Sequence, residues 1–216
     1  MPPFEKHTML RFPPATRSDG TASARAQDAE QIEQTLLAGI VRGVRSDFDL
    51  LYRIYYPRLT RFLLRMTGRA ALSEELLDDT LLLVWQRAAA FNGTSKVSTW
   101  IFGIAYRKAL KALSRLDDPV AQDSDAVSEP DPLPGPPALV EQLQRNQQLI
   151  DALAQLSVDH RAVVELCYFQ NMDYREIAAV VHCPVDTVKS RMFYARRRLK
   201  SLLVDADPLA FGEAAR

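Results

Sequence analysis

The chain has 216 residues, of which 47% are hydrophobic and 25% are charged, and its 27 basic residues balance its 27 acidic residues. This length suits two modest domains, and a content of only 8 glycines disfavours an all-β fold with many tight turns. No window approaches the roughly 18 apolar residues that a membrane span needs, and Met1–Phe12 lacks the apolar core of a signal peptide. We therefore expect a cytoplasmic protein without direct membrane insertion.

The balanced charge is unevenly distributed along the chain. Residues 47–116 contain 11 Lys and Arg against 6 Asp and Glu, and residues 145–203 contain 9 against 6. Residues 117–141 contain 7 acids and no basic residue. Basic segments favour a polyanion such as nucleic acid, whereas an acidic segment is repelled by nucleic acid or substitutes for it. A solvated surface with an acidic linker explains the same distribution.

The N-terminal part of the chain gives the weakest structural signal. Residues 1–28 mix Pro, Ser, Thr, Gly and Arg without apolar periodicity, so we expect them to be disordered. A helical pattern begins at Asp28 and ends near Gly43, which predicts a short accessory helix. Residues 1–46 are therefore assigned to a partly disordered N-terminal extension.

The following segment predicts three amphipathic helices. Apolar residues at steps of three and four indicate a first helix that bends at Pro57 and ends at Gly68. Ser73 is predicted to cap a second helix that continues to about Ala90. The third helix is predicted over Thr99–Leu116.

The fold class that follows is all-α, with two small helical domains joined by an acidic, Pro-rich linker. The linker, residues 117–139, has almost no large apolar residue and cannot form a packed core. The predicted domains are 47–116 and 140–203, the second with helices near 138–156, 159–170, 174–181 and 184–203, and residues 204–216 form a tail.

Within the second domain, Asp173 and Glu176 form a D-x-x-E capping box that opens a short helix. His182 and Cys183 break this helix, and Pro184 suits the first turn of the next one. This pattern indicates a helix-turn-helix, whose second helix enters the DNA major groove. A solvated basic helix at the end of a domain is the alternative. The predicted DNA-binding residues on this helix are Thr187, Lys189, Ser190, Arg191, Phe193, Tyr194 and Arg197.

The same segment resembles region 4 of the extracytoplasmic-function (ECF) sigma factors, a branch of the sigma-70 family. The resemblance lies in Leu156–Arg161, Tyr174–Ala178 and Cys183–Arg191. The first domain resembles region 2 of the same family, through Ser73–Thr80, Val84–Trp85, Phe91–Gly93 and Ser98–Ile101. Three turn positions depart from the family pattern, because Ser157 stands where Pro is usual and Asn171 and His182 stand where Gly is usual.

The resemblance implies an alternative sigma factor that binds core RNA polymerase and directs promoter-specific transcription initiation. Region 2 then melts and recognises the minus-ten promoter element, and region 4 recognises the minus-thirty-five element. Matching positions place polymerase contacts at Glu75, Asp78, Asp79 and Trp85, although the acids also suit a helix N-terminus and Trp85 also suits a core position. Matching positions for region 2 DNA contacts are Phe91, Asn92, Thr94, Ser95 and Lys96 in a loop. Arg107 and Lys111, on one face of the next helix, are predicted to contact phosphates and single-stranded bases, although an ordinary solvated face explains them too.

The resemblance also bears on regulation. The acidic linker resembles the segment that threads the RNA exit path of the polymerase, although a solvated tether fits its composition equally well. An anti-sigma factor is a common partner in the family. Alternatively, the N-terminal extension holds the protein inactive by packing the helix after Asp28 on either domain.

Two other function classes compete with this interpretation. A stand-alone helix-turn-helix regulator would normally need a dimerising element, and none is evident in the sequence. An enzyme would need a catalytic constellation, but the chain has three histidines, no Gly-rich phosphate loop and no metal-ligand cluster. We therefore expect no catalytic residues, no metal, no cofactor and no small-molecule substrate.

Overall fold

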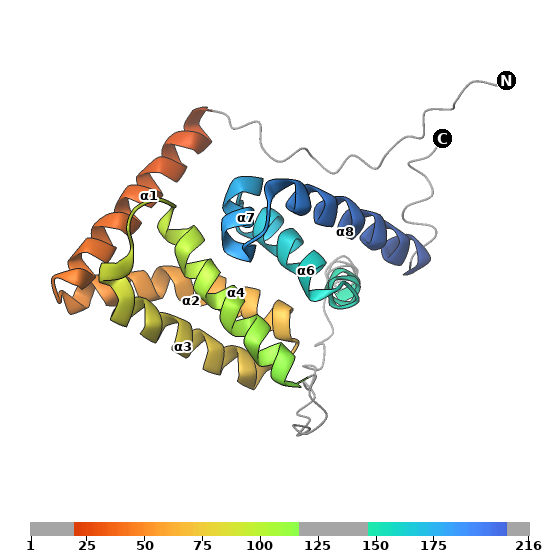
Figure 1. The fold of residues 1–216 in the computed structure, drawn as a ribbon, viewed down its shortest axis with the longest axis horizontal. Coiled ribbons are helices and arrows are strands. Elements are labelled where there is room, and N and C mark those ends of the chain that lie inside the picture. The colour runs from red at the N-terminus through yellow and green to blue at the C-terminus, as the bar shows by residue number, and fades with distance from the viewer. Residues whose placement is uncertain (1–19, 117–146, 207–216) are drawn as a thin grey trace, which may run out of the picture.

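The computed structural model describes residues 20–116 and 147–206, and every regular element in these ranges is helical. The linker at 117–139 and most of the predicted disordered and tail segments lie outside the described residues. The N-terminal unit consists of α1 Gly20–Val41, α2 Arg45–Thr67, α3 Ala70–Arg87, the 3-10 turn η1 Ala88–Ala90 and α4 Val97–Leu116 (Figure 1). The C-terminal unit consists of a helix at 147–154, α6 Val158–Val164, the π-helical turn η2 Glu165–Phe169, α7 Tyr174–Val181 and α8 Val185–Ala206. The predicted all-helical fold is confirmed.

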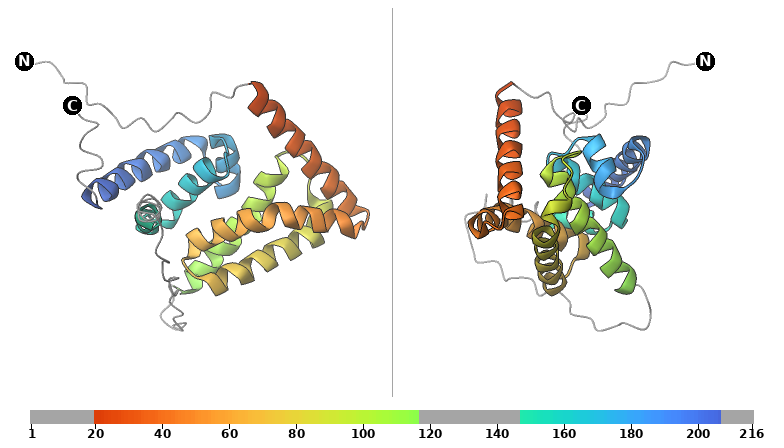
Figure 2. Two further views of the ribbon diagram at one scale, coloured as in Figure 1. Left: turned by 180° about the vertical axis from the view of Figure 1, so that it is seen from behind. Right: turned by 60° about the vertical axis from the view of Figure 1, so that its left-hand side comes forward.

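Helix α1 is longer and more closely integrated than the expected accessory helix. It has 22 residues and contacts α2, which it meets at a large angle (Figure 2), with further contacts to η1 and α4. Leu36, Leu37 and Ile40 are buried in the core of the N-terminal unit. Glu33 is also buried, and its carboxylate accepts a 2.5 Å hydrogen bond from the hydroxyl of Tyr55. The described part of the N-terminal extension is therefore a structural element of the first unit.

The boundary between α2 and α3 contains one confirmed and one wrong prediction. Gly68 adopts a left-handed conformation with φ of 69°, and its N–H donates to the Leu64 carbonyl, so α2 ends where expected. Helix α2 continues through Pro57 as a single element. Ser73, however, does not cap α3, which begins at Ala70. The buried Ser73 hydroxyl donates to the carbonyl of Arg69, four residues earlier, as serine does inside a helix.

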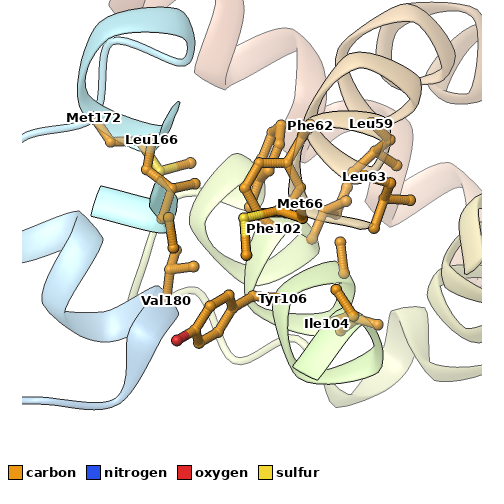
Figure 3. Close-up of a cluster of buried hydrophobic side chains, with 14 of the residues drawn as sticks. Leu59, Phe62, Leu63, Met66, Phe102, Ile104, Tyr106, Leu166, Met172 and Val180 are labelled. Atoms are coloured by element: carbon orange, nitrogen blue, oxygen red, sulfur yellow. The ribbon is translucent and has the colours of Figure 1, made fainter. Parts of the chain in front are cut away.

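The two units share one hydrophobic core. Helix α4 packs on α7, and α2 contacts α6. Figure 3 shows Phe62, Met66, Phe102 and Tyr106 of the N-terminal unit in one cluster with Leu166, Met172 and Val180 of the C-terminal unit. Phe62 and Phe102 are fully buried and meet edge to face, with ring centroids 5.2 Å apart. The units are thus held together by buried side chains from both.

Candidate nucleic-acid and polymerase interfaces

The helix-turn-helix forms as the sequence indicates. The Asp173 carboxylate accepts hydrogen bonds from the N–H groups of Arg175 and Glu176, at 2.7 and 2.9 Å, and the Glu176 carboxylate accepts one from the N–H of Asp173 at 2.8 Å. The predicted capping box at the start of α7 is confirmed. At the end of α7, His182 adopts a left-handed conformation with φ of 52°. This conformation turns the chain into α8 directly after Pro184.

Helix α8 carries the predicted region 4 contacts on a largely exposed face. Phe193 and Tyr194 are 54% and 55% exposed, which is unusual for aromatic side chains on a packed helix. Opposite them, Val188, Met192, Ala195 and Leu199 are buried in the core. The exposed members of the predicted set are Lys189, Ser190, Phe193, Tyr194 and Arg197, and Thr187 is half-buried.

Arg191 lies in a different environment from the other predicted DNA contacts. Its guanidinium donates to the carboxylate of Asp159 at 2.6 Å, and its side chain is only 23% exposed. The other oxygen of Asp159 accepts a hydrogen bond from Tyr106 of α4 at 3.2 Å. Burial and the nearby Asp159 charge raise the pKa of Tyr106 to about 12. Arg191 thus joins α8 to α6, and a DNA contact by Arg191 stays a prediction.

The loop between η1 and α4 contains the predicted base-capturing residues. Asn92 Oδ1 accepts hydrogen bonds from the backbone N–H and the hydroxyl of Thr94, at 3.1 and 2.7 Å, which fixes a tight turn. Asn92 and Thr94 are exposed and Ser95 is half-buried. Phe91 packs against Trp100, with ring centroids 5.5 Å apart, so its ring is not free in solvent. The loop therefore exposes polar groups on a backbone that the Asn92 hydrogen bonds hold in place.

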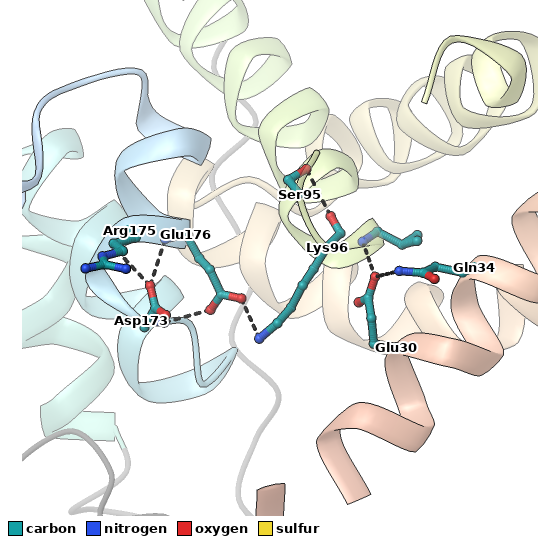
Figure 4. Close-up of polar contacts among 8 residues, drawn as sticks. Glu30, Gln34, Ser95, Lys96, Asp173, Arg175 and Glu176 are labelled. Atoms are coloured by element: carbon teal, nitrogen blue, oxygen red, sulfur yellow. Dashed lines mark hydrogen bonds and ion pairs between the residues drawn. The ribbon is translucent and has the colours of Figure 1, made fainter. Parts of the chain in front are cut away.

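The end of this loop is held by two acids from other helices (Figure 4). The Glu30 carboxylate of α1 accepts a 3.0 Å hydrogen bond from the N–H of Val97, the first residue of α4. The Glu176 carboxylate of α7 pairs with the Lys96 ammonium at 2.5 Å. The hydrogen bond to Glu176 is the largest of the effects that raise the pKa of Lys96. Neither contact was predictable from local sequence, since they join residues 67 and 80 positions apart.

The two predicted cations on α4 differ in their contacts. The Arg107 guanidinium lies 2.6 Å from Nε2 of His182 in the C-terminal unit. A guanidinium can only donate, so Nε2 is the acceptor. Lys111 is exposed near the end of α4. Of these two predicted region 2 contacts, Arg107 therefore touches the C-terminal unit, whereas Lys111 faces solvent.

The predicted polymerase contacts lie on α3. Glu75, Asp78 and Asp79 are exposed, and the Asp79 carboxylate accepts a 2.7 Å hydrogen bond from the Lys108 ammonium of α4. Trp85 is 37% exposed and packs edge-on against Phe48 at a centroid distance of 4.9 Å. The core position that we considered for Trp85 is therefore wrong, because its ring lies at the surface.

Sequence reasoning missed an aromatic row beside this tryptophan. The ring of Phe48 contacts that of Tyr52 edge-on, with centroids 6.3 Å apart. Tyr52 in turn stacks on Tyr56, with centroids 5.4 Å apart. Burial, followed by the negative charge of Asp78, raises the pKa of Tyr52. We call Phe48, Tyr52, Tyr56 and Trp85 the aromatic row. Phe48, Tyr52 and Tyr56 are spaced i, i+4 along α2, and this spacing could have predicted the row, because such residues share one helix face.

Two features are absent from the described ranges. None of the helices in 20–116 and 147–206 combines the length and the hydrophobicity of a membrane span. In the same residues, no group of three or more His, Cys, Asp or Glu side chains is arranged to hold a metal ion.

Known protein families match both units of the chain. The family model for sigma-70 region 2 matches residues 51–118, and that for sigma-70 region 4 matches residues 146–199. Among solved structures, CnrH in complex with the cytosolic domain of CnrY has a TM-score of 0.61 at 23% identity, over 82% of this chain and 99% of that chain, which shows a shared fold. The sigma factor RpoE from Bartonella quintana, in complex with the anti-sigma factor NepR, has a TM-score of 0.59 at 25% identity, over 73% of this chain and 96% of that chain.

Bacterial sigma factors align over most of the chain. The ECF RNA polymerase sigma factor RpoE of Cereibacter sphaeroides is 30% identical over 177 residues, which are 79% of this chain and 97% of that protein. The ECF RNA polymerase sigma factor SigL of Mycobacterium tuberculosis is 32% identical over 156 residues, 71% of this chain and 86% of that protein. With both sigma-70 regions present in order, the chain belongs to the ECF family of RNA polymerase sigma factors, the alternative sigma factors that direct transcription initiation.

Proposed function

We propose that the C-terminal unit of this chain recognises the minus-thirty-five promoter element through α8, while the N-terminal unit melts and binds the minus-ten element. The exposed polar and aromatic face of α8, presented by a helix-turn-helix, is the observation that carries this assignment. Ser190, Phe193 and Tyr194 supply hydrogen bonds and apolar contacts for base edges, and Lys189 and Arg197 supply charge for phosphates.

The loop before α4 is proposed to hold an unstacked base of the nontemplate strand. Asn92 and Thr94 expose hydrogen-bonding groups on a backbone that the Asn92 turn fixes. Unstacking a base costs a few kcal/mol, and contacts to its freed edge and face offset that cost. Arg107 and Lys111 of α4 then follow the strand and neutralise its phosphates.

Core polymerase is proposed to dock on α3 and the aromatic row. Glu75 and Asp78 form an exposed acidic patch close to an apolar surface of four aromatic rings. Acids complementary to a basic partner set orientation and association rate, whereas buried aromatic rings contribute most of the binding free energy. The polymerase catalyses RNA synthesis, so this chain acts without catalytic groups of its own, in the cytoplasm.

An anti-sigma factor is a further proposed partner. RpoE of Bartonella quintana, which has the same fold, was solved in complex with the anti-sigma factor NepR. Such a partner would prevent transcription by covering the polymerase-binding surface or the promoter-binding surface.

Paired variants test these roles separately. Ser190→Ala with Phe193→Ala should lower transcription from the chain's own promoters at least tenfold and leave binding to core polymerase unchanged. Glu75→Lys with Asp78→Lys should weaken core binding at least tenfold. Asp151→Lys, a charge reversal at an exposed acid of the helix at 147–154, is the control and should change neither result. Tight binding of the chain to promoter duplex without polymerase, together with no binding to core, would instead support a stand-alone regulator.

A further inference from the structure

The loop that is proposed to hold the unstacked minus-ten base, residues 92–96, is fixed at both ends. At its start, Phe91 packs against Trp100 of α4, with ring centroids 5.5 Å apart. At its end, Val97 opens α4 and has no exposed surface. Between these two points most of the loop is exposed. The position that the loop offers to a base therefore depends on how firmly its two ends are held.

Glu30 of α1 holds the second end of the loop. Its Oε1 atom accepts a 3.0 Å hydrogen bond from the N–H of Val97. The N–H groups in the first turn of a helix lack partners within that helix, and a negative charge beside them is favourable. Because Val97 is fully buried, water does not reach its N–H in place of the carboxylate. Glu30 thus acts as a cap of α4, although it lies 67 positions earlier in the chain.

Helix α1 restrains Glu30 for this contact. The amide of Gln34, one turn further along α1, donates a 2.9 Å hydrogen bond to the same Oε1 atom (Figure 4). Glu33 is buried, and its carboxylate accepts a hydrogen bond from the Tyr55 hydroxyl of α2. Helix α1 also contacts η1, the turn that leads into the loop. Both the backbone of α1 and the Glu30 side chain are therefore held beside the loop.

We propose, building on the proposed role of this loop in minus-ten recognition, that Glu30 is a positioning residue for base capture. It acts through the loop and not on the base. By holding the N–H of Val97, it sets where the exposed groups of Asn92 and Thr94 meet the unstacked base. Hydrogen bonds distinguish one base from another only when donors and acceptors are held opposite each other. A loop with a released end therefore loses selectivity for the captured base.

The base selectivity of the holoenzyme tests this role. Full-length chain is combined with core polymerase, and binding to a fluorescent nontemplate-strand oligonucleotide is measured by anisotropy. The oligonucleotide carries the minus-ten element of a promoter found by mapping transcription start sites. Each position of the element is replaced in turn by the other three bases. A wrong base in a specific site weakens binding about 5- to 150-fold, so a change in this ratio is measurable.

Glu30→Ala removes the acceptor and should reduce selectivity at one minus-ten position about threefold or more, while the other positions change less than about twofold. Glu30→Gln keeps an oxygen that accepts from Val97 and should retain the wild-type selectivity. Asp28→Ala removes an exposed acid from the same helix and is the control, which should also behave as wild type. Binding to core polymerase should be the same in all of these variants.

Gln34→Ala provides a second, milder test, which applies even where Glu30→Ala fails to fold by circular dichroism. It removes the amide that steadies Glu30 and leaves the cap of α4 in place. The same selectivity should then fall about twofold, as expected for the loss of one exposed hydrogen bond.

The outcomes separate the positioning role from the proposed function. Unchanged selectivity in folded Glu30→Ala, or in Gln34→Ala where the first variant is unfolded, would overturn the positioning role. An equal loss at every minus-ten position, the pattern of a destabilised domain, or a Glu30→Gln variant as defective as Glu30→Ala would do the same. A wild-type holoenzyme with no base preference at any minus-ten position would instead refute the proposed function of the loop, whatever the Glu30 variants show.

Discussion

The Arg65–Glu165 pair gives the sharpest stability prediction. In Arg65→Met, the Glu165 carboxylate remains fully buried without its guanidinium partner, and its Oε1 atom already makes no hydrogen bond in the wild-type protein. Breaking a buried pair in this way costs about 3–5 kcal/mol. The variant also loses the stacking of Arg65 over Phe169, at 3.8 Å from the ring centroid, a contact worth about 0.5–2 kcal/mol. Urea denaturation followed by circular dichroism at pH 7.5 measures the change in free energy of unfolding.

The pH dependence of this loss distinguishes a charge effect from a packing effect. Burial raises the pKa of Glu165, although Arg65 opposes this. The folded protein therefore binds the Glu165 proton more tightly than the unfolded chain, and this group's contribution to stability decreases as pH rises through the folded pKa. Without Arg65 the folded pKa is higher still, so the deficit of the variant should be smaller at pH 5 than at pH 7.5.

A second substitution completes the test. Arg65→Met combined with Glu165→Met removes both charges, and replacing a buried pair with apolar side chains is often close to neutral. The double variant should recover most of the stability that the single variant loses. A deficit below about 1 kcal/mol in the single variant, no change with pH, or a double variant as unstable as the single one would refute this reasoning.

Three further changes have defined outcomes in thermal denaturation. Asp173→Ala removes the acceptor of the α7 capping box and should cost about 1–2 kcal/mol, with Asp173→Ser as the capping control that retains most stability. Asn171→Gly relieves a left-handed conformation with φ of 52° and should stabilise the fold by up to about 1 kcal/mol, so a decrease in Tm would contradict it. Phe62→Ala removes a fully buried ring packed on Phe102 and should cost about 3–5 kcal/mol, and a loss under about 1 kcal/mol would show that this contact is not in the core.

Local signals allowed much of the fold to be predicted. The capping box of α7 depends on two residues three positions apart, so the sequence specifies it directly. The end of α2 at Gly68 was predictable for the same reason, since one residue supplies the left-handed conformation. Ser73 was misassigned because a serine hydroxyl accepts at an N-cap but donates inside a helix, and the local sequence fits both.

Features that depend on tertiary packing were not predictable from spacing. Glu165 and Arg65 are 100 residues apart, and nothing near either residue shows that they meet. The exposed positions of α8 were predictable because its apolar stripe fixes which face is buried, whereas the Asp159 contact of Arg191 depends on how α6 lies beside it. The aromatic row was missed although its spacing was visible, because its first member, Phe48, also fits the buried stripe of α2.

The assignment of promoter selection to this chain is tested most directly by mapping transcription start sites. The purified protein is mixed with sigma-free core polymerase and genomic DNA fragments, and the run-off transcripts are sequenced with and without the chain. The account predicts new, discrete start sites that share an upstream sequence motif and disappear with Ser190→Ala and Phe193→Ala. An unchanged set of transcripts, obtained with protein that is folded and mixed in excess over core, would contradict it.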